Sequence, residues 1–109
     1  MKETDKEVVL EFKRRLTTDL ASLVSRILVY GSRARGTGKE DSDLDLLVLL
    51  RKKNAILEQE LEDIAYQVMW DYDFKPIISL KVFPESRFLD AVSKGFSFYK
   101  HIQKEGIPI

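Results

Sequence analysis

The chain has no cysteine, one histidine and no long apolar run. The absence of cysteine excludes disulfides, thiol catalysis and thiolate metal sites, and it suits a reducing cytosol. The longest unbroken apolar run, Leu46 to Leu50, is far too short to span a bilayer. The first residues, MKETDKEVV, are charged where a signal peptide needs an apolar stretch. We therefore expect a cytoplasmic protein with no membrane segment.

The chain also lacks an excess of either charge. Lys and Arg total 18, Asp and Glu total 18, and the formal net charge is zero. General binding to nucleic acid or to anionic membranes is therefore not expected, and any bound anion must be held by local contacts. A length of 109 residues suits one domain with a modest core, so we predict a single domain over residues 1–109.

Hydrophobic periodicity predicts alternating helices and strands. The predicted elements are a helix over 4–24 opened by a capping box of Thr4 and Glu7, a strand over 27–30, a helical turn over 32–35, a strand over 44–50, a helix over 56–72, a strand over 77–83, a helix over 84–93 and a short helix or extended tail over 96–105. The order α-β-(α)-β-α-β-α implies an α+β fold with α/β-like alternation, in which helices flank a small mixed sheet of three or more strands.

Several side chains outside the central loop have simple structural interpretations. Tyr66, Trp70 and Phe74 recur every four residues, which predicts core packing. Phe96, Phe98 and Tyr99 fit a core, a dimer contact or a partner surface equally well. His101, the sole histidine, is interpreted as a surface residue, and Asp71 and Asp73 as part of a turn that follows a helix.

The stretch GSRARGTGKEDSDLDLLVLL, residues 31–50, holds the candidate chemistry. It fits neither of the two common phosphate-binding fingerprints. A Walker loop needs glycine five residues before its Gly-Lys pair and Ser or Thr after it, but Arg33 and Glu40 occupy those places. A G-x-G-x-x-G dinucleotide fingerprint fails because Asp41 stands at the last glycine position.

A different phosphate site remains open. Gly31 allows close backbone approach to a ligand, and the Ser32 hydroxyl and the N–H groups of the following turn could hold phosphate oxygens. Asp43 and Asp45 lie two residues apart on a strand, so they project from one face about 7 Å apart at the backbone. Mg²⁺ is commonly held by one or two carboxylates plus substrate phosphates. The alternative is a long polar connection in which Asp41, Ser42 and Asp43 are turn residues.

The motif GSRARGTGKEDSDLDLLV closely resembles the G-S-x-x-x-G…S-D-x-D signature of the DNA polymerase beta-like nucleotidyltransferase superfamily, and the size of the chain is similar to that of its minimal nucleotidyltransferase (MNT) branch. The resemblance extends from the first helix through the third strand and implies the nucleotidyltransferase fold. It implies that Gly31 and Ser32 contact the nucleotide triphosphate and that Asp43 and Asp45 are catalytic ligands of Mg²⁺ or Mn²⁺. Arg33 and Arg35 are further candidates for nucleotide binding, with ordinary surface arginines as the alternative.

The chain departs from the family pattern at one place. The full catalytic set has a third carboxylate, usually on the third core strand and on the face of the aspartate pair. The polar face of the predicted third strand offers Ser79 and Lys81 instead. Lys81 could contact phosphate but would repel a second metal. Asp73 and Glu85 flank the strand and are the remaining candidates for a substitute.

We therefore predict a nucleotidyltransferase that binds an NTP, expected to be ATP, with Mg²⁺ and transfers AMP or another nucleoside monophosphate to a hydroxyl. Minimal members of the family are often antitoxins encoded beside a HEPN-domain toxin, so the resemblance implies such a partner protein as acceptor. One alternative is a catalytically weak or inactive nucleotide-binding module that acts by binding its partner. Another is a transferase for a small hydroxylated molecule such as an aminoglycoside. The sequence leaves homo-oligomer formation open.

Overall fold

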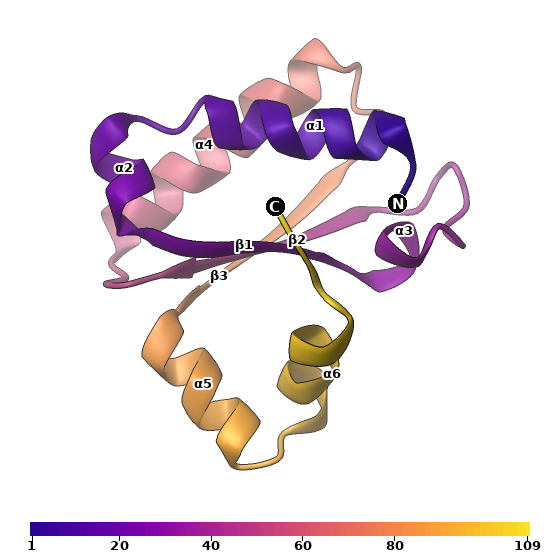
Figure 1. Ribbon diagram of the computed structural model, residues 1–109. Helices are drawn as coiled ribbons and strands as arrows, with labels where there is room; N and C mark the ends of the chain where they lie inside the picture. Colours follow the sequence, from indigo (N-terminus) through magenta and orange to yellow (C-terminus); the bar gives the residue numbers. More distant parts are fainter.

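The computed structural model describes all residues, 1–109. Figure 1 shows a twisted sheet between two helical layers. In chain order the elements are α1 Glu3–Arg14, α2 Thr18–Leu23, β1 Val24–Tyr30, α3 Gly31–Arg35, β2 Leu44–Leu50, α4 Ala55–Asp71, β3 Ile78–Pro84, α5 Glu85–Ser93, α6 Ser97–Glu105 and β4 Ile107–Pro108. The predicted alternation and the predicted small mixed sheet are confirmed.

The sheet has the strand order β3-β2-β1-β4. The strand β1 pairs antiparallel with both β2 and β4, whereas β2 pairs parallel with β3. The parallel pair is joined by α4, because two parallel neighbours need a long crossover connection. The helices α1, α2 and α4 cover one face of the sheet, and α5 and α6 cover the other (Figure 1).

The single helix predicted over 4–24 is wrong, because the chain breaks between α1 and α2. Thr17 caps the second helix, its Oγ1 accepting a hydrogen bond from the N–H of Leu20 at 3.1 Å. The predicted capping box is also absent: Lys2 is the N-cap of α1 and makes no side-chain cap. Both helices pack on the same core, which is why apolar periodicity continued across the break.

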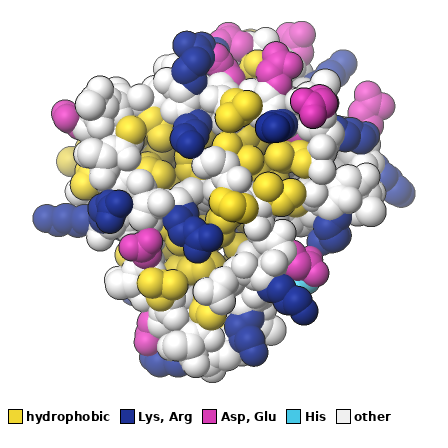
Figure 2. Space-filling model, in the orientation of Figure 1, with side chains coloured by type: hydrophobic (Ala, Val, Ile, Leu, Met, Phe, Trp, Pro, Cys, Tyr) yellow, Lys and Arg dark blue, Asp and Glu magenta, His cyan; other side chains and the backbone are white.

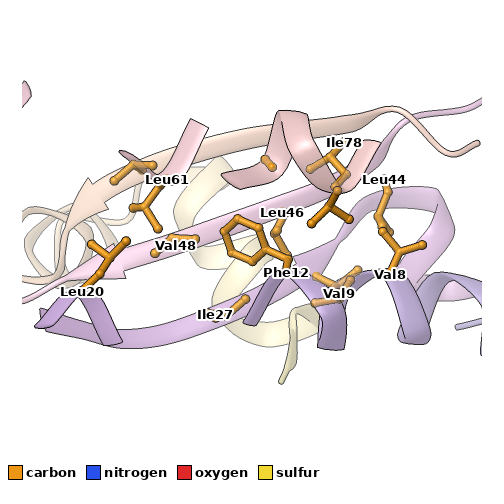
Figure 3. Packing of buried hydrophobic residues seen from close by; sticks show 14 of the residues in the cluster. Val8, Val9, Phe12, Leu20, Ile27, Leu44, Leu46, Val48, Leu61 and Ile78 are labelled. Atoms are coloured by element: carbon orange, nitrogen blue, oxygen red, sulfur yellow. The ribbon is translucent and has the colours of Figure 1, made fainter. Parts of the chain in front are cut away.

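The larger of the two cores lies between the sheet and the layer of α1, α2 and α4. Phe12 of α1 is fully buried at its centre, and Figure 3 shows its ring between the helix and the strand residues Leu46, Val48 and Ile27. Alternate residues of β2 point to the other face, where Leu47 and Leu49 pack with Phe88 of α5 and Ile102 of α6. The strand β2 is therefore buried on both faces, as its continuous apolar sequence suggests.

The aromatic residues of α4 do not form core, contrary to the sequence prediction. Tyr66 and Trp70 are 52% and 61% exposed, and with Phe74 they make edge contacts at centroid distances of 5.2–6.2 Å. The buried face of α4 is formed instead by Leu61, Ala65 and Val68. Spacing by four residues showed correctly that the aromatic rings share a face, but that face is the outer one.

The visible surface mixes both charges. Figure 2 shows Lys and Arg side chains interspersed with Asp and Glu, while hydrophobic side chains reach the surface across the middle. His101 is exposed, as predicted, and its Nε2 lies 2.9 Å from Glu105 Oε2. None of the helices has the length and apolar character needed to cross a bilayer.

Candidate active site

The polar stretch after β1 is an ordered loop wrapped around the short helix α3. The Ser32 carbonyl accepts hydrogen bonds from the N–H groups of Thr37 and Gly38, both at 3.1 Å. A Cβ at Gly38 would lie 2.9 Å from the Ser32 hydroxyl and 2.7 Å from the Ser42 hydroxyl. The lack of a side chain at Gly38 therefore lets the two serines of the motif converge on one point of the loop.

Arg33 anchors this loop from inside the protein. Its guanidinium donates to the Ser42 carbonyl at 2.6 Å, to the Glu40 carbonyl at 2.6 Å and to Asp5 Oδ1 at 2.9 Å. The residue is 8% exposed and Asp5 is 1% exposed. Each of its three nitrogens already donates to a protein acceptor, so Arg33 is engaged inside the protein, and the predicted nucleotide contact stays a prediction. Its role is to hold the loop against α1.

Arg35 lies on the outer side of α3 and remains a candidate phosphate ligand. Its side chain is half exposed, and its nearest anionic partner is Glu105, with Nη1 and Oε2 separated by 3.8 Å. A contact of this length at an exposed position is weak, so the guanidinium can turn to a bound anion at little cost.

Gly31 lies directly against the second aspartate of the motif. Its φ is +79°, and a Cβ placed on it would be 2.4 Å from Asp45 Oδ2. Any other residue would be strained in this backbone conformation and would collide with the carboxylate. The absence of a side chain at Gly31 therefore lets the start of α3 approach the Asp45 carboxylate, and the close approach to a ligand inferred for Gly31 stays a prediction.

Asp43 and Asp45 stand at the beginning of β2, in line with the spacing argument. Asp43 is exposed and precedes the strand. Asp45 is half-buried, and it pairs with Tyr30 of β1 on one side and with Ser79 of β3 on the other. Burial raises the pKa of Asp45, the Lys81 charge lowers it, and the Asp43 charge raises it further.

The third strand brings no acid to this region. Ser79 pairs directly with Asp45, and Lys81 follows two residues later on the same face. No three His, Cys, Asp or Glu side chains come together in a group that could hold a metal ion. Neither Asp73 nor Glu85 therefore stands in for the missing carboxylate.

Tyr30, which the sequence argument did not single out, belongs to the same cluster. It is the last residue of β1 and is 8% exposed, and its hydroxyl is buried with no hydrogen-bond partner. Burial raises the pKa of this hydroxyl, the nearby Lys81 lowers it and Asp45 raises it. The sequence did contain a signal for Tyr30, because it comes immediately before Gly31. The last residue of a strand that leads into a phosphate-binding turn lies next to the site.

Two hollows flank the motif. One of about 360 Å³ lies between α3 and α6 and is lined by Tyr30, Gly31, Ser97, Phe98, His101 and Ile102. The other, of about 640 Å³, separates the loop residues Lys39–Ser42 from residues Phe74–Ile77. Both volumes are in the range of small-molecule sites. A site with room on either side suits a reaction that joins two substrates.

Asp43 and Asp45 are the residues that could hold a divalent cation. Mg²⁺ is typically bound by one or two carboxylates together with phosphate oxygens of the substrate. Asp43 and Asp45 can supply the carboxylates, and Gly31 and Ser32 place the N-terminal turn of α3, with its free N–H groups, beside them. A second cation would have no carboxylate of its own.

The sequence belongs to a known family of transferases. Residues 6–104 match the family of the nucleotidyltransferase domain, so the chain is a member of that family. The matched range contains the stretch from Gly31 to Asp45. The family named from the resemblance is thereby confirmed.

Two known proteins are similar to the chain. A protein of Methanocaldococcus jannaschii named "Putative protein adenylyltransferase MJ0141" is 36% identical over 89 residues, which cover 79% of this chain and 89% of the relative. A solved structure described as "Crystal structure of the toxin-antitoxin with AMP-PNP" has the same fold, with a TM-score of 0.57 and 16% identity over 95% of this chain and 70% of that one.

Proposed function

We propose that this protein transfers AMP from ATP to a hydroxyl group of a partner protein, using Mg²⁺ held by Asp43 and Asp45. The observation that carries the proposal is the contact between Gly31 and Asp45, because it joins a phosphate-binding turn to a metal-binding carboxylate. The relative named as a protein adenylyltransferase supports both AMP and a protein acceptor.

The reaction forms one bond and breaks one. The acceptor oxygen attacks the α-phosphorus of ATP, the bond between that phosphorus and the bridging oxygen to the β-phosphate breaks, and pyrophosphate leaves while the hydroxyl proton passes to solvent. The α3 backbone and the Ser32 hydroxyl hold the triphosphate, and Arg35 adds a positive charge beside it. Asp43 and Asp45 would hold the divalent cation, which when bound would supply Lewis-acid stabilisation of the phosphate charge.

The similarity in fold to a toxin–antitoxin complex supports a toxin as the partner, and we propose a HEPN-domain toxin as the acceptor. The protein would then act as an antitoxin whose modification inactivates its partner. A hydroxyl supplied by a macromolecule also suits the hollow of about 640 Å³ beside the loop, which is open to the surface along residues Phe74–Ile77.

The test is incubation of the protein with Mg²⁺, the HEPN-domain protein encoded beside it and ATP labelled at either the α- or the γ-phosphate. We expect label on the partner from α-labelled ATP only, with release of pyrophosphate. The Asp43→Asn/Asp45→Asn variant should transfer nothing. Asp19→Asn changes an exposed aspartate of α2 that lies outside the motif and both hollows, so it is the matched control and should retain transfer. Absence of labelled product with any of the four NTPs contradicts the enzymatic proposal.

One observation favours a second candidate function. Ser79 and Lys81 occupy the strand where a third acid was expected, so no carboxylate is placed to take the proton of the acceptor hydroxyl. A nucleotide-binding module that masks its partner needs no such base. Mg²⁺-dependent ATP binding without pyrophosphate release, combined with a stable complex with the partner, would identify this second function.

A further inference from the structure

Lys81 places a cation on the strand where the family pattern has a third carboxylate. The parallel register pairs Asp45 with Ser79 and Leu47 with Lys81. Since side chains alternate along a strand, Asp45, Ser79 and Lys81 all project from the face covered by α5 and α6. Lys81 is exposed on the edge strand β3, so its side chain is free to turn toward a bound ligand.

The register also shows what lies beside Lys81 on this face. Asp45 pairs with Ser79, which is two residues before Lys81, and Tyr30 of β1 pairs with Asp45 on its other side. The flexible side chain of Lys81 can therefore extend along β3 toward Asp45 and the end of the sheet where α3 begins.

The same arrangement offers only two carboxylates for metal binding. Sites with two metals hold them about 4 Å apart, between the attacking and the leaving oxygen. Here β3 adds no acid to Asp43 and Asp45, no cluster of three metal-binding side chains exists, and Lys81 projects from the same face as Asp45. An ammonium group so placed repels a second divalent ion while it attracts phosphate oxygens.

We propose that Lys81 replaces the second metal ion, so that this site works with one divalent cation, held by Asp43 and Asp45, and one built-in ammonium group. This proposal rests on the nucleotide site described under Proposed function. Lys81 binds an oxygen of the departing pyrophosphate and neutralises the charge that accumulates there when the α–β bridge breaks. It remains protonated throughout, so the bonds made and broken are those already described.

The test counts metal ions directly and needs no turnover. The protein is mixed with Mn²⁺ and α,β-methylene-ATP, which cannot be cleaved at the bond that this reaction breaks. Bound Mn²⁺ is then measured by electron paramagnetic resonance, and bound nucleotide by calorimetry. We expect one Mn²⁺ per bound nucleotide. Two Mn²⁺ per nucleotide would overturn the proposal, whereas no nucleotide binding at all would instead contradict the site underlying the proposed function.

Three variants separate the charge of Lys81 from other effects. Lys81→Glu restores an acid on the shared face and should raise the count to two Mn²⁺ per nucleotide. Lys81→Met should keep one Mn²⁺ and weaken nucleotide binding about tenfold, the value of one charge-assisted contact. Lys52→Glu makes the same charge change in the exposed turn at the opposite end of β2 and should alter neither quantity. A count of one in Lys81→Glu, or unchanged nucleotide affinity in Lys81→Met, would overturn the role given to Lys81.

Discussion

At the scale of single residues, the site depends on a glycine that has no space for a side chain. Gly31 and Gly36 begin and end the same short helix with nearly equal φ values of +79° and +75°. A Cβ at Gly31 would collide with Asp45 Oδ2, whereas a Cβ at Gly36 would meet nothing within 4 Å. The pair therefore separates backbone strain from loss of the contact with the carboxylate.

We expect Gly31→Ala and Gly36→Ala each to destabilise the protein by about 1–3 kcal/mol, because both place a side chain at positive φ. Only Gly31→Ala should abolish binding of Mg²⁺ with ATP, since it displaces either Asp45 or the start of α3. Urea unfolding measures the first effect and calorimetric titration the second. Equal nucleotide affinity in the two variants would mean that the approach of Gly31 to Asp45 has no part in binding.

Asp45 illustrates the conflict between function and stability at one residue. Burial raises the pKa of its carboxyl in the folded chain, the Lys81 charge opposes this, and the Asp43 charge adds to it. Between the unfolded value, about 4, and the raised folded value, the folded chain binds more protons than the unfolded chain does. The contribution of the Asp45 carboxyl to the free energy of unfolding of the metal-free protein therefore falls as pH rises through that interval.

Asparagine imitates the protonated carboxyl, so Asp45→Asn should be more stable than the original protein at pH 7 and equally stable below pH 4. Thermal unfolding without metal, measured across this range, checks the prediction. Asp41→Asn removes a charge from an exposed turn and should show no such pH-dependent gain. The Asp45→Asn variant should also lose Mg²⁺-dependent nucleotide binding, and a stability difference that does not change with pH would contradict the assigned cause.

At the scale of elements, periodicity identified which residues share a face but not always which face is buried. The helix predicted over 56–72 and the strand predicted over 44–50 match α4 and β2 closely, because burial on one or both faces leaves a direct pattern in the sequence. The outward position of Tyr66 and Trp70 was not predictable in this way. Their spacing of four is equally compatible with a core and with mutual contacts at the surface, and only the packing partners of α4 decide between them.

The buried pair of Asp5 and Arg33 joins two elements that the sequence did not connect. Arg33→Met should destabilise the protein by about 3–5 kcal/mol, because it leaves the Asp5 carboxylate buried without its partner. Addition of Asp5→Leu should recover much of this loss, since no buried charge remains. Urea unfolding of the two single variants and the double variant measures the coupling.

The same variants report on the loop. Both Arg33→Met and the double variant lack the donor to the Glu40 and Ser42 carbonyls, so limited proteolysis should cut residues 36–42 faster in each of them than in the original chain. Recovery of global stability with continued loop cleavage would separate the two functions of Arg33. If the double variant is no more stable than Arg33→Met, the loss of stability in Arg33→Met does not come from an unpaired buried charge at Asp5.

At the scale of the whole molecule, the motif and the order of elements were predictable, but the closure of the sheet was not. The Gly-Ser and Asp-x-Asp residues are local signals with fixed spacing, and the structure brings Gly31 and Asp45 into contact. Strand order depends on pairing between distant segments, which leaves little local trace. The strand β4 has only two residues and no periodicity, yet it closes the free side of β1.

This closure leads to a prediction about the C-terminal segment. Ile107 pairs with Val29, the N–H of Ile109 donates to the Ile27 carbonyl at 3.0 Å, and Ile107 and Ile109 pack against the larger core. Deletion of residues 106–109 removes these contacts and exposes the backbone edge of β1. We expect a loss of about 2–4 kcal/mol from the two partly buried isoleucines and the hydrogen bonds. An exposed edge strand also invites pairing with a second copy.

Urea unfolding and light scattering at increasing concentration distinguish the two consequences. The Ile107→Ser/Ile109→Ser variant removes the apolar contacts but keeps the backbone that covers β1. It should therefore lose stability without a change of oligomeric state, whereas the deletion should both lose stability and associate further than the full chain does. Only the deletion leaves backbone N–H and C=O groups of β1 unpaired. If the deletion and the serine variant associate equally, assembly is therefore controlled by the apolar contacts and not by the covered edge of β1.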